Sequence, residues 1–365
     1  MMLADLPTPC LVLDRSILTR NIRGMARALQ RLNVPLRPHM KTAKSIEVAR
    51  MALEGQPGGI TVSTLAEAEY FFGHGITDIL YAVGITPQKL ERVARLNASG
   101  AQIIVITDDP VVADAITAQP APIRALIEID SGEGRGGVHP DSDRVIELAA
   151  RLGPCFAGVM THAGHSYSGR HASEIAAVAE AERGAVAHAA ERLREAGYHA
   201  GIVSAGSSPT ARHAENLAGI TEMRAGVYMF GDLFQAEIET HGADGIAVTV
   251  LASVIGRRPG RVLVDAGGLA LSKDRSTEST LHDFGYGLAM DIEGQRSYGH
   301  AIVAKAYQEH GVIEVDPMRP IHLPIGGKLR IAPNHTCMTS AAHDRYFVVD
   351  GDQHVTAIWH RVNGW

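Results

Sequence analysis

The sequence predicts an α/β protein: a (β/α)8 TIM-type barrel over residues 15–243, then a mostly β domain over residues 244–365 that also includes about residues 1–14. Two observations lead to this prediction. Through the first two-thirds of the chain, eight short β-rich segments alternate with helix-like segments, as they do in barrels of parallel strands. From about Gly245 on, short β-branched segments separated by turn residues replace the helical patterns, which favours a mostly β domain.

The barrel strands are predicted from β-rich runs bounded by turn residues. They are Leu36–Lys41, Ile60–Thr64, Asp78–Val83, Ile103–Thr107, Arg124–Asp130, Cys155–His162, Gly201–Ala205 and Glu222–Tyr228. Helices are predicted over Ser16–Leu32, Thr42–Leu53, Pro87–Leu96 and Ala172–Ala196. The last of these ends at Gly197, a residue typical of helix C-caps. An open, doubly wound sheet is the structural alternative to the barrel.

The strands of the second domain are predicted over Ala247–Ile255, Arg261–Asp265, Gly311–Val315, Lys328–Ala332, Tyr346–Asp350 and Val355–Trp359. The segment Pro9–Asp14 also has the character of a strand, but eight barrel strands leave no place for it. We therefore expect this N-terminal segment to join the β-domain.

Composition excludes several classes of protein. The chain has 365 residues, of which 45% are hydrophobic and 20% charged, as in ordinary soluble proteins. Its net charge is -6 and its basic residues are scattered, so no nucleic-acid partner is expected. No apolar run is long enough to span a membrane, and residues 1–9 do not resemble a signal peptide. Three widely spaced cysteines fit a reducing cytoplasm.

Lys41 is the first candidate for chemistry, because it ends the first predicted barrel strand. Active sites of such barrels lie at the carboxyl ends of the strands. A lysine placed there, with Lys44 as a basic neighbour, can have its pKa lowered and become a nucleophile for carbonyl groups. Position alone equally allows a solvated surface lysine.

Two small-residue loops follow the seventh and eighth predicted strands, at 204–210 and 224–228. These are the places where such barrels recurrently bind phosphate. Small residues let backbone N–H groups approach a phosphate, although ordinary Gly/Ser turns would look the same. A third loop, 129–138, surrounds Arg135 with glycines, which would let the arginine lie close to a ligand or leave it exposed in a turn.

A candidate metal site lies in the stretch Pro333-Asn334-His335-Thr336-Cys337. In an extended segment, residues i and i+2 point the same way, so His335 and Cys337 could share one ion. Imidazole and thiolate together suit Zn²⁺. A buried cysteine beside a hydrogen-bonded histidine is the alternative.

These segments together resemble the D-serine dehydratase / D-threonine aldolase family, whose members are alanine-racemase-like, fold-type III enzymes of pyridoxal 5'-phosphate (PLP). The likeness runs through nearly the whole chain. It includes RPHMKTAKS (37–45), ITVSTLAEAE (60–69), ILYAV (79–83), THAG (161–164), RAGVY (224–228), DFGYG (283–287), QEHG (308–311) and PNHTC (333–337).

The resemblance implies roles for individual residues. Lys41 would hold PLP as a Schiff base and later act as the catalytic base, and His162 would be a catalytic residue beside the cofactor. Arg135 would face the pyridine nitrogen. The other cofactor-binding residues implied are His39, Tyr167, Gly206, Ser207, Gly226 and Tyr228. The metal ligands implied are His335 and Cys337, with zinc expected and manganese or magnesium as alternatives.

The function implied is that of a PLP- and divalent-metal-dependent lyase on D-β-hydroxy amino acids. We expect a dehydratase, which converts D-threo-3-hydroxyaspartate or D-serine to a 2-oxo acid and ammonia, and which works as a cytoplasmic homodimer. An arginine at the pyridine nitrogen weakens the ring as an electron sink, and a metal acting as Lewis acid on the β-oxygen would compensate.

Three other functions stay open. Aldolases of the family resemble one another in a Tyr-His-Gly stretch and a His-x-Asp metal pair, whereas this chain has Ala163 and Cys337 at those places. D-threonine aldolase activity is therefore the second candidate. An amino-acid racemase would need no metal pair, and a non-catalytic PLP carrier would lack the β-domain.

Overall fold

The computed structural model describes residues 1–365, which fold into two compact units. The barrel unit comprises residues 24–226 and 362–365, and the β unit comprises residues 1–23 and 227–361. The chain therefore leaves the β unit near its end, and the amide of Val362 donates to the carbonyl oxygen of Lys44, 2.9 Å away, within the barrel unit.

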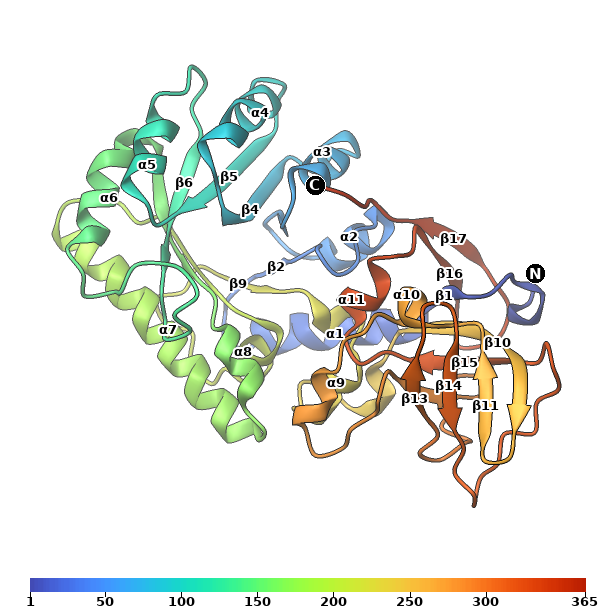
Figure 1. Ribbon diagram of the computed structural model, residues 1–365. Coiled ribbons are helices and arrows are strands. Elements are labelled where there is room, and N and C mark those ends of the chain that lie inside the picture. Colours follow the sequence, from blue (N-terminus) through green and yellow to red (C-terminus); the bar gives the residue numbers. More distant parts are fainter. The chain divides into compact units, whose positions relative to one another are not determined.

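Eight parallel strands form the barrel unit, in the order β2-β9-β8-β7-β6-β5-β4-β3 (Figure 1). Their bounds are β2 (Leu36–Pro38), β3 (Ile60–Val62), β4 (Asp78–Gly84), β5 (Gln102–Thr107), β6 (Arg124–Ile129), β7 (Phe156–Thr161), β8 (Ile202–Ala205) and β9 (Glu222–Ala225). The two ends of this sheet meet where His39 bridges Thr61 in parallel and the Met40 amide donates to the Thr61 carbonyl oxygen at 2.8 Å. The predicted barrel is confirmed, and the open sheet is wrong.

Helices connect the strands. They are α2 (Ile46–Leu53), α3 (Leu65–Gly73), α4 (Pro87–Ala98), α5 (Pro110–Thr117), α6 (Arg144–Leu152), α7 (Ala172–Glu195) and α8 (Ser208–His213), while α1 (Arg15–Gln30) precedes β2. Proline opens α4 and α5, where its missing N–H costs nothing, and Asp109 caps α5. The interior is filled by aliphatic side chains from successive strands, among them Leu80, Ile104 and Leu126.

The β unit is built on one nine-stranded sheet, in the order β11-β14-β13-β12-β15-β10-β1-β16-β17. The strands are β1 (Cys10–Asp14), β10 (Val248–Arg258), β11 (Arg261–Val264), β12 (Leu288–Met290), β13 (Ile302–Ala306), β14 (Gly311–Glu314), β15 (Lys328–Ala332), β16 (Arg345–Val349) and β17 (Ala357–His360). Short helices α9 (Leu233–Glu237), α10 (Gly268–Leu271) and α11 (Thr336–Ser340) lie between strands.

The N-terminal strand β1 belongs to this sheet, where it lies between β10 and β16. It pairs antiparallel with β10 and parallel with β16, and all five of its residues are buried. Sequence analysis missed β12 and β13. β12 has only three residues, and β13 contains two alanines and a lysine, so neither shows a β-rich run; their sheet partners define them.

Short 3-10 helices complete the chain, at η1 (Leu3–Asp5), η2 (Gly153–Cys155), η3 (Gly164–Ser168), η4 (Val227–Met229), η5 (Ala243–Gly245) and η6 (Ser276–Ser279). None of the helices combines the length and apolarity that a membrane crossing requires. All three cysteines are free thiols.

Candidate active site

Parallel strands place their carboxyl ends on one rim of the barrel, and most of the predicted cofactor residues lie there. Lys41 follows β2, Arg135 follows β6, and His162 follows β7 directly. Gly206 and Ser207 follow β8, and Gly226 follows β9. Residues up to 185 positions apart in the chain are thereby gathered at one end of the barrel unit, as the distance in sequence between Lys41 and Gly226 shows.

The Lys41 amine is exposed at this rim and has no ion-pair or hydrogen-bond partner. Its neighbour Lys44 differs in both respects. Lys44 adopts a left-handed backbone conformation, and its Nζ lies 3.3 Å from the Oε1 atom of the fully buried Glu67. Of the two lysines, only Lys41 therefore has an amine that is free to react with a carbonyl group.

Two histidines beside Lys41 are held neutral. Burial lowers the pKa of His162 to about 3, and the charges of Lys41 and Arg224 add to the shift, while a hydrogen bond to the Gly206 carbonyl opposes it. Burial and the charges of Lys41 and Arg224 also hold the pKa of His39 well below its usual range. Both imidazoles can therefore contact a ligand as flat, uncharged rings.

The loops after β8 and β9 need their glycines for packing. Gly206 has φ +124°, and a Cβ there would lie 2.4 Å from the Arg224 carbonyl oxygen. A Cβ on Gly226 would lie 2.8 Å from the His39 carbonyl oxygen. Ser207 caps α8 through its hydroxyl, which accepts from the Thr210 amide at 3.2 Å. Tyr228 is buried in η4, and Tyr167 is half-buried in η3.

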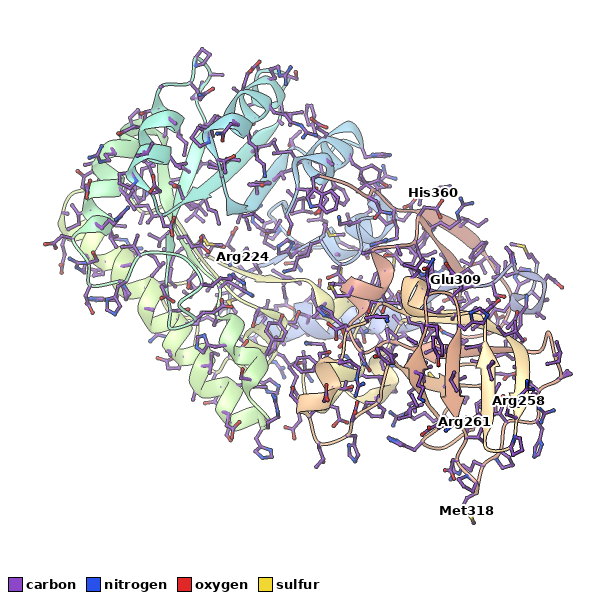
Figure 2. All side chains as sticks on the ribbon, viewed as in Figure 1. Arg224, Arg258, Arg261, Glu309, Met318 and His360 are labelled. Atoms are coloured by element: carbon purple, nitrogen blue, oxygen red, sulfur yellow. The ribbon has the colours of Figure 1, made fainter.

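The rim carries two arginines of different character. Arg135 is exposed on the loop after β6, where it pairs with Glu133 at 3.4 Å. Arg224 is buried among the barrel strands (Figure 2) and donates to the Ser204 hydroxyl at 2.7 Å and to the Thr161 carbonyl oxygen at 2.5 Å. Sequence analysis singled out Arg224 only as part of a motif, because an interior arginine inside a strand has no signal of its own.

His335 and Cys337 lie in the β unit, but not on the extended segment that we predicted. His335 precedes α11 and Cys337 belongs to its first turn. That helix begins here because the buried carboxylate of Asp232 accepts the Thr336 amide at 3.0 Å, and the Asn334 side chain binds two backbone carbonyls. The i and i+2 argument from strand geometry was therefore wrong.

The two side chains nevertheless interact with each other, and a third joins them. The Cys337 thiol is hydrogen-bonded to His335. The Nδ1 atom of His335 lies 3.1 Å from the Asp274 carboxylate, so Nε2 is the ring nitrogen that this contact does not use. Asp274 was missed, because an aspartate in the loop Ser272-Lys273-Asp274 has no spacing that relates it to residue 335. Imidazole and thiol are two donors that suit a divalent metal, and the Asp274 carboxylate is placed to orient the imidazole.

Two family models match the chain. The model of the alanine racemase N-terminal domain matches residues 13–233, and that of a putative serine dehydratase domain matches residues 247–349. With a closed parallel barrel and a following β-sheet unit, the chain is a protein of the alanine-racemase-like class.

Relatives with named activities show which family within this class the chain belongs to. D-threo-3-hydroxyaspartate dehydratase of Delftia sp. (strain HT23) is 40% identical over 100% of this chain and 99% of its own. D-serine dehydratase of Dictyostelium discoideum is 32% identical over 96% and 95%, and D-threonine aldolase of Arthrobacter sp is 32% identical over 98% and 92%. The chain belongs to the D-serine dehydratase / D-threonine aldolase family.

The solved structure of the Delftia enzyme covers 100% of both chains with a TM-score of 0.95 and 40% identity. Similar solved structures also include two mutants of a D-threo-3-hydroxyaspartate dehydratase, in which a histidine or, two positions further on, a cysteine is replaced by alanine, the latter in the metal-free form. His335 and Cys337 have the same spacing in this chain.

Proposed function

We propose that this chain is a PLP- and divalent-metal-dependent lyase that removes water from D-β-hydroxy amino acids, with D-threo-3-hydroxyaspartate or D-serine as substrate. The observation that carries the proposal is the free amine of Lys41 on the carboxyl rim of an alanine-racemase-like barrel. The relatives that bear the names dehydratase and aldolase support a lyase.

The rim residues fit PLP. Lys41 would hold its carbonyl carbon, Arg135 would face its ring nitrogen, and the neutral rings of His39 and His162 would lie beside it. Gly206, Ser207, Gly226 and Tyr228 would surround its phosphate, and Tyr167 would line the same site. When bound, PLP supplies an electron sink for a bond that breaks at the substrate's Cα.

Each residue has a defined task in such a reaction. The Lys41 amine removes the proton from Cα and keeps it on Nζ. His162 carries its own proton on Nδ1, because that atom faces the Gly206 carbonyl oxygen at 3.0 Å. The Nε2 atom of His162 then keeps a lone pair, so the ring can accept a hydrogen bond from the substrate.

We propose His335 and Cys337 as the metal ligands, with zinc as the metal. The Asp274 carboxylate holds Nδ1 of His335 and so orients the ring, as carboxylates commonly do for metal-bound histidines. A divalent metal supplies Lewis-acid activation of a poor leaving group such as a β-hydroxyl.

Elimination is favoured over retro-aldol cleavage because of Ala163. Cleavage between Cα and Cβ needs a base for the hydroxyl proton, and the histidine that resembles such a base in the family's aldolases is replaced by Ala163 here. Loss of one positioned base costs about 10²–10⁴ in rate. Aldolase activity remains the second candidate, since the relatives include an aldolase.

Product analysis tests the proposal. Purified enzyme would be incubated with D-threonine, D-serine and D-threo-3-hydroxyaspartate, each beside its L counterpart. Ammonia and a 2-oxo acid from the D substrates are expected. Glycine and an aldehyde as main products would identify the activity as that of an aldolase. Racemised substrate as the main product would contradict both lyase activities.

We further propose a cytoplasmic homodimer, supported by the family resemblance and by three free thiols. Sedimentation of the active enzyme at several concentrations tests the dimer, and a fully active monomer would contradict it.

A further inference from the structure

One buried carboxylate ties two loops of the carboxyl rim together. Glu182 lies on α7 and is only 1% exposed. Its Oε1 atom accepts the amide N–H of Ala163 at 2.9 Å and that of Gly206 at 3.0 Å. The first amide directly follows His162 at the end of β7, and the second begins the loop after β8.

We propose that Glu182 is a positioning residue, which fixes His162 and the loop 206–207 relative to each other and thereby shapes the site for the phosphate and ring of PLP. The inference rests on the proposed function. No part of Glu182 needs to touch the ligand, because its oxygen acts through the two backbone amides.

The geometry of the loop after β8 leads to this assignment. The Gly206 amide is used by Glu182, and the Ser207 amide donates to the Thr210 hydroxyl oxygen at 2.9 Å. The Thr210 hydroxyl in turn is hydrogen-bonded to Glu182. Both amides therefore bond to protein atoms. Glu182 and Thr210, which accept these bonds, determine where the loop of Gly206 and Ser207 lies.

A second connection makes the arrangement a closed ring of contacts. Nδ1 of His162 lies 3.0 Å from the carbonyl oxygen of the same Gly206. Glu182 thus binds the amides of Ala163 and Gly206, and the His162 imidazole adds a separate bond to the Gly206 carbonyl oxygen. Without Glu182, the His162–Gly206 hydrogen bond would have to hold the ring and the loop in place without the two amide bonds.

Charge supports a role beyond packing. Burial raises the pKa of Glu182, and hydrogen bonds from Thr210, Ala163 and Gly206 together with the charge of Arg224 oppose that shift. A buried carboxyl group costs free energy that an apolar side chain would not. The hydrogen bonds from Ala163, Gly206 and Thr210 offset that cost.

The test compares three variants as purified apo-protein titrated with PLP. Glu182→Ala removes the acceptor from both amides, and PLP should bind about 10- to 100-fold more weakly, by analogy with the loss of metal affinity when the partners that orient metal ligands are removed. Glu182→Gln retains one acceptor oxygen and should restore most of the affinity. Glu191→Ala, an exposed position on the same helix that pairs only with Arg194, should bind PLP like the native protein.

Thermal unfolding of each apo-variant separates positioning from stability. If Glu182→Ala does not fold, Thr210→Val, which removes one hydroxyl of the same network, replaces it and should weaken PLP binding in the same direction. Native affinity for PLP in folded Glu182→Ala or Thr210→Val would overturn the inference. Failure of the native chain itself to bind PLP would instead refute the proposed function.

Discussion

The imidazole of His162 and the carbonyl oxygen of Gly206 lie 3.0 Å apart, Nδ1 to oxygen, and join the end of β7 to the loop after β8. Since burial keeps the ring uncharged, Nδ1 donates its proton to this carbonyl. The ring is therefore fixed in orientation and in tautomer before any ligand binds. This relationship leads to a pH dependence that can be measured without turnover.

The apo-protein should lose stability between pH 7 and pH 5 partly through His162. An unfolded histidine takes up a proton near pH 6.5, whereas folded His162 does so only near pH 3. Between these values the unfolded chain binds more protons, so the free energy of unfolding falls as the pH falls, by about 2 kcal/mol at pH 5. His162→Asn keeps an N–H for Gly206 and should show a pH-dependent loss smaller by this amount in urea titrations. Equal losses in both proteins would contradict the assignment.

Lys41 and Lys44 should respond differently to substitution. Borohydride treatment of the PLP-loaded enzyme, followed by peptide mapping, should place the label on Lys41, and Lys41→Ala should take up none. Lys44→Ala should still be labelled at Lys41. It should unfold more easily, by about 1–3 kcal/mol, because Glu67 loses its buried charge partner. A label on Lys44 would transfer the cofactor role to that residue.

Metal removal should separate turnover from cofactor binding. Metal analysis of the native protein should find a divalent ion that Cys337→Ala has lost, and this variant should bind PLP but not dehydrate substrate. Cys155→Ala changes a buried thiol of the barrel unit and serves as the matched control, with native metal content. Full activity after chelation would contradict a catalytic metal.

Glycines at the rim should be intolerant of a side chain. Gly206→Ala places a Cβ 2.4 Å from the Arg224 carbonyl oxygen at φ +124°, so a loss of about 3 kcal/mol is expected. Gly24→Ala in α1 has no atom within 4 Å and an ordinary φ, and should gain about 0.5–1 kcal/mol from helix propensity. Chemical denaturation of both variants checks the pair, and a stable Gly206→Ala protein would disprove the close approach.

Sequence patterns predicted the barrel because each of its strands is a local feature. Runs such as Ile103–Thr107 are β-rich over their whole length, and the turn residues that bound them are visible without a partner. β13 was missed because its lysine and alanines become a strand only beside β12 and β14. Part of the candidate site was predictable for the same reason. Lys41 and the loop at 204–210 were recognised from their place at the ends of predicted strands.

Residues that act through distant partners could not be found by such reasoning. Glu182 lies among other charged residues of α7, and its sequence neighbourhood looks like a solvated helix face. Only the fold brings its carboxylate to Ala163 and Gly206. Asp274 likewise meets His335 from 61 positions away, which no spacing rule relates.

The last prediction concerns the choice between two reactions at Ala163. This residue is fully buried, and its amide is held by Glu182, so the position is fixed directly beside His162. Ala163→His would introduce the base that resembles the one in the family's aldolases. With D-threonine, the share of glycine and acetaldehyde should then rise, by up to about 10²-fold relative to the 2-oxo acid, since one positioned general base contributes 10²–10⁴.

Ala163→Asn is the matched control, because it adds a polar side chain of intermediate size without a base. Both variants must crowd a buried site, so unfolding curves are needed to show that each is folded. A rise in glycine for histidine but not for asparagine would identify the base as the determinant. Equal product ratios in the native protein and in folded Ala163→His would mean that residue 163 does not decide the reaction, and the metal pair at His335 and Cys337 would become the feature to exchange next.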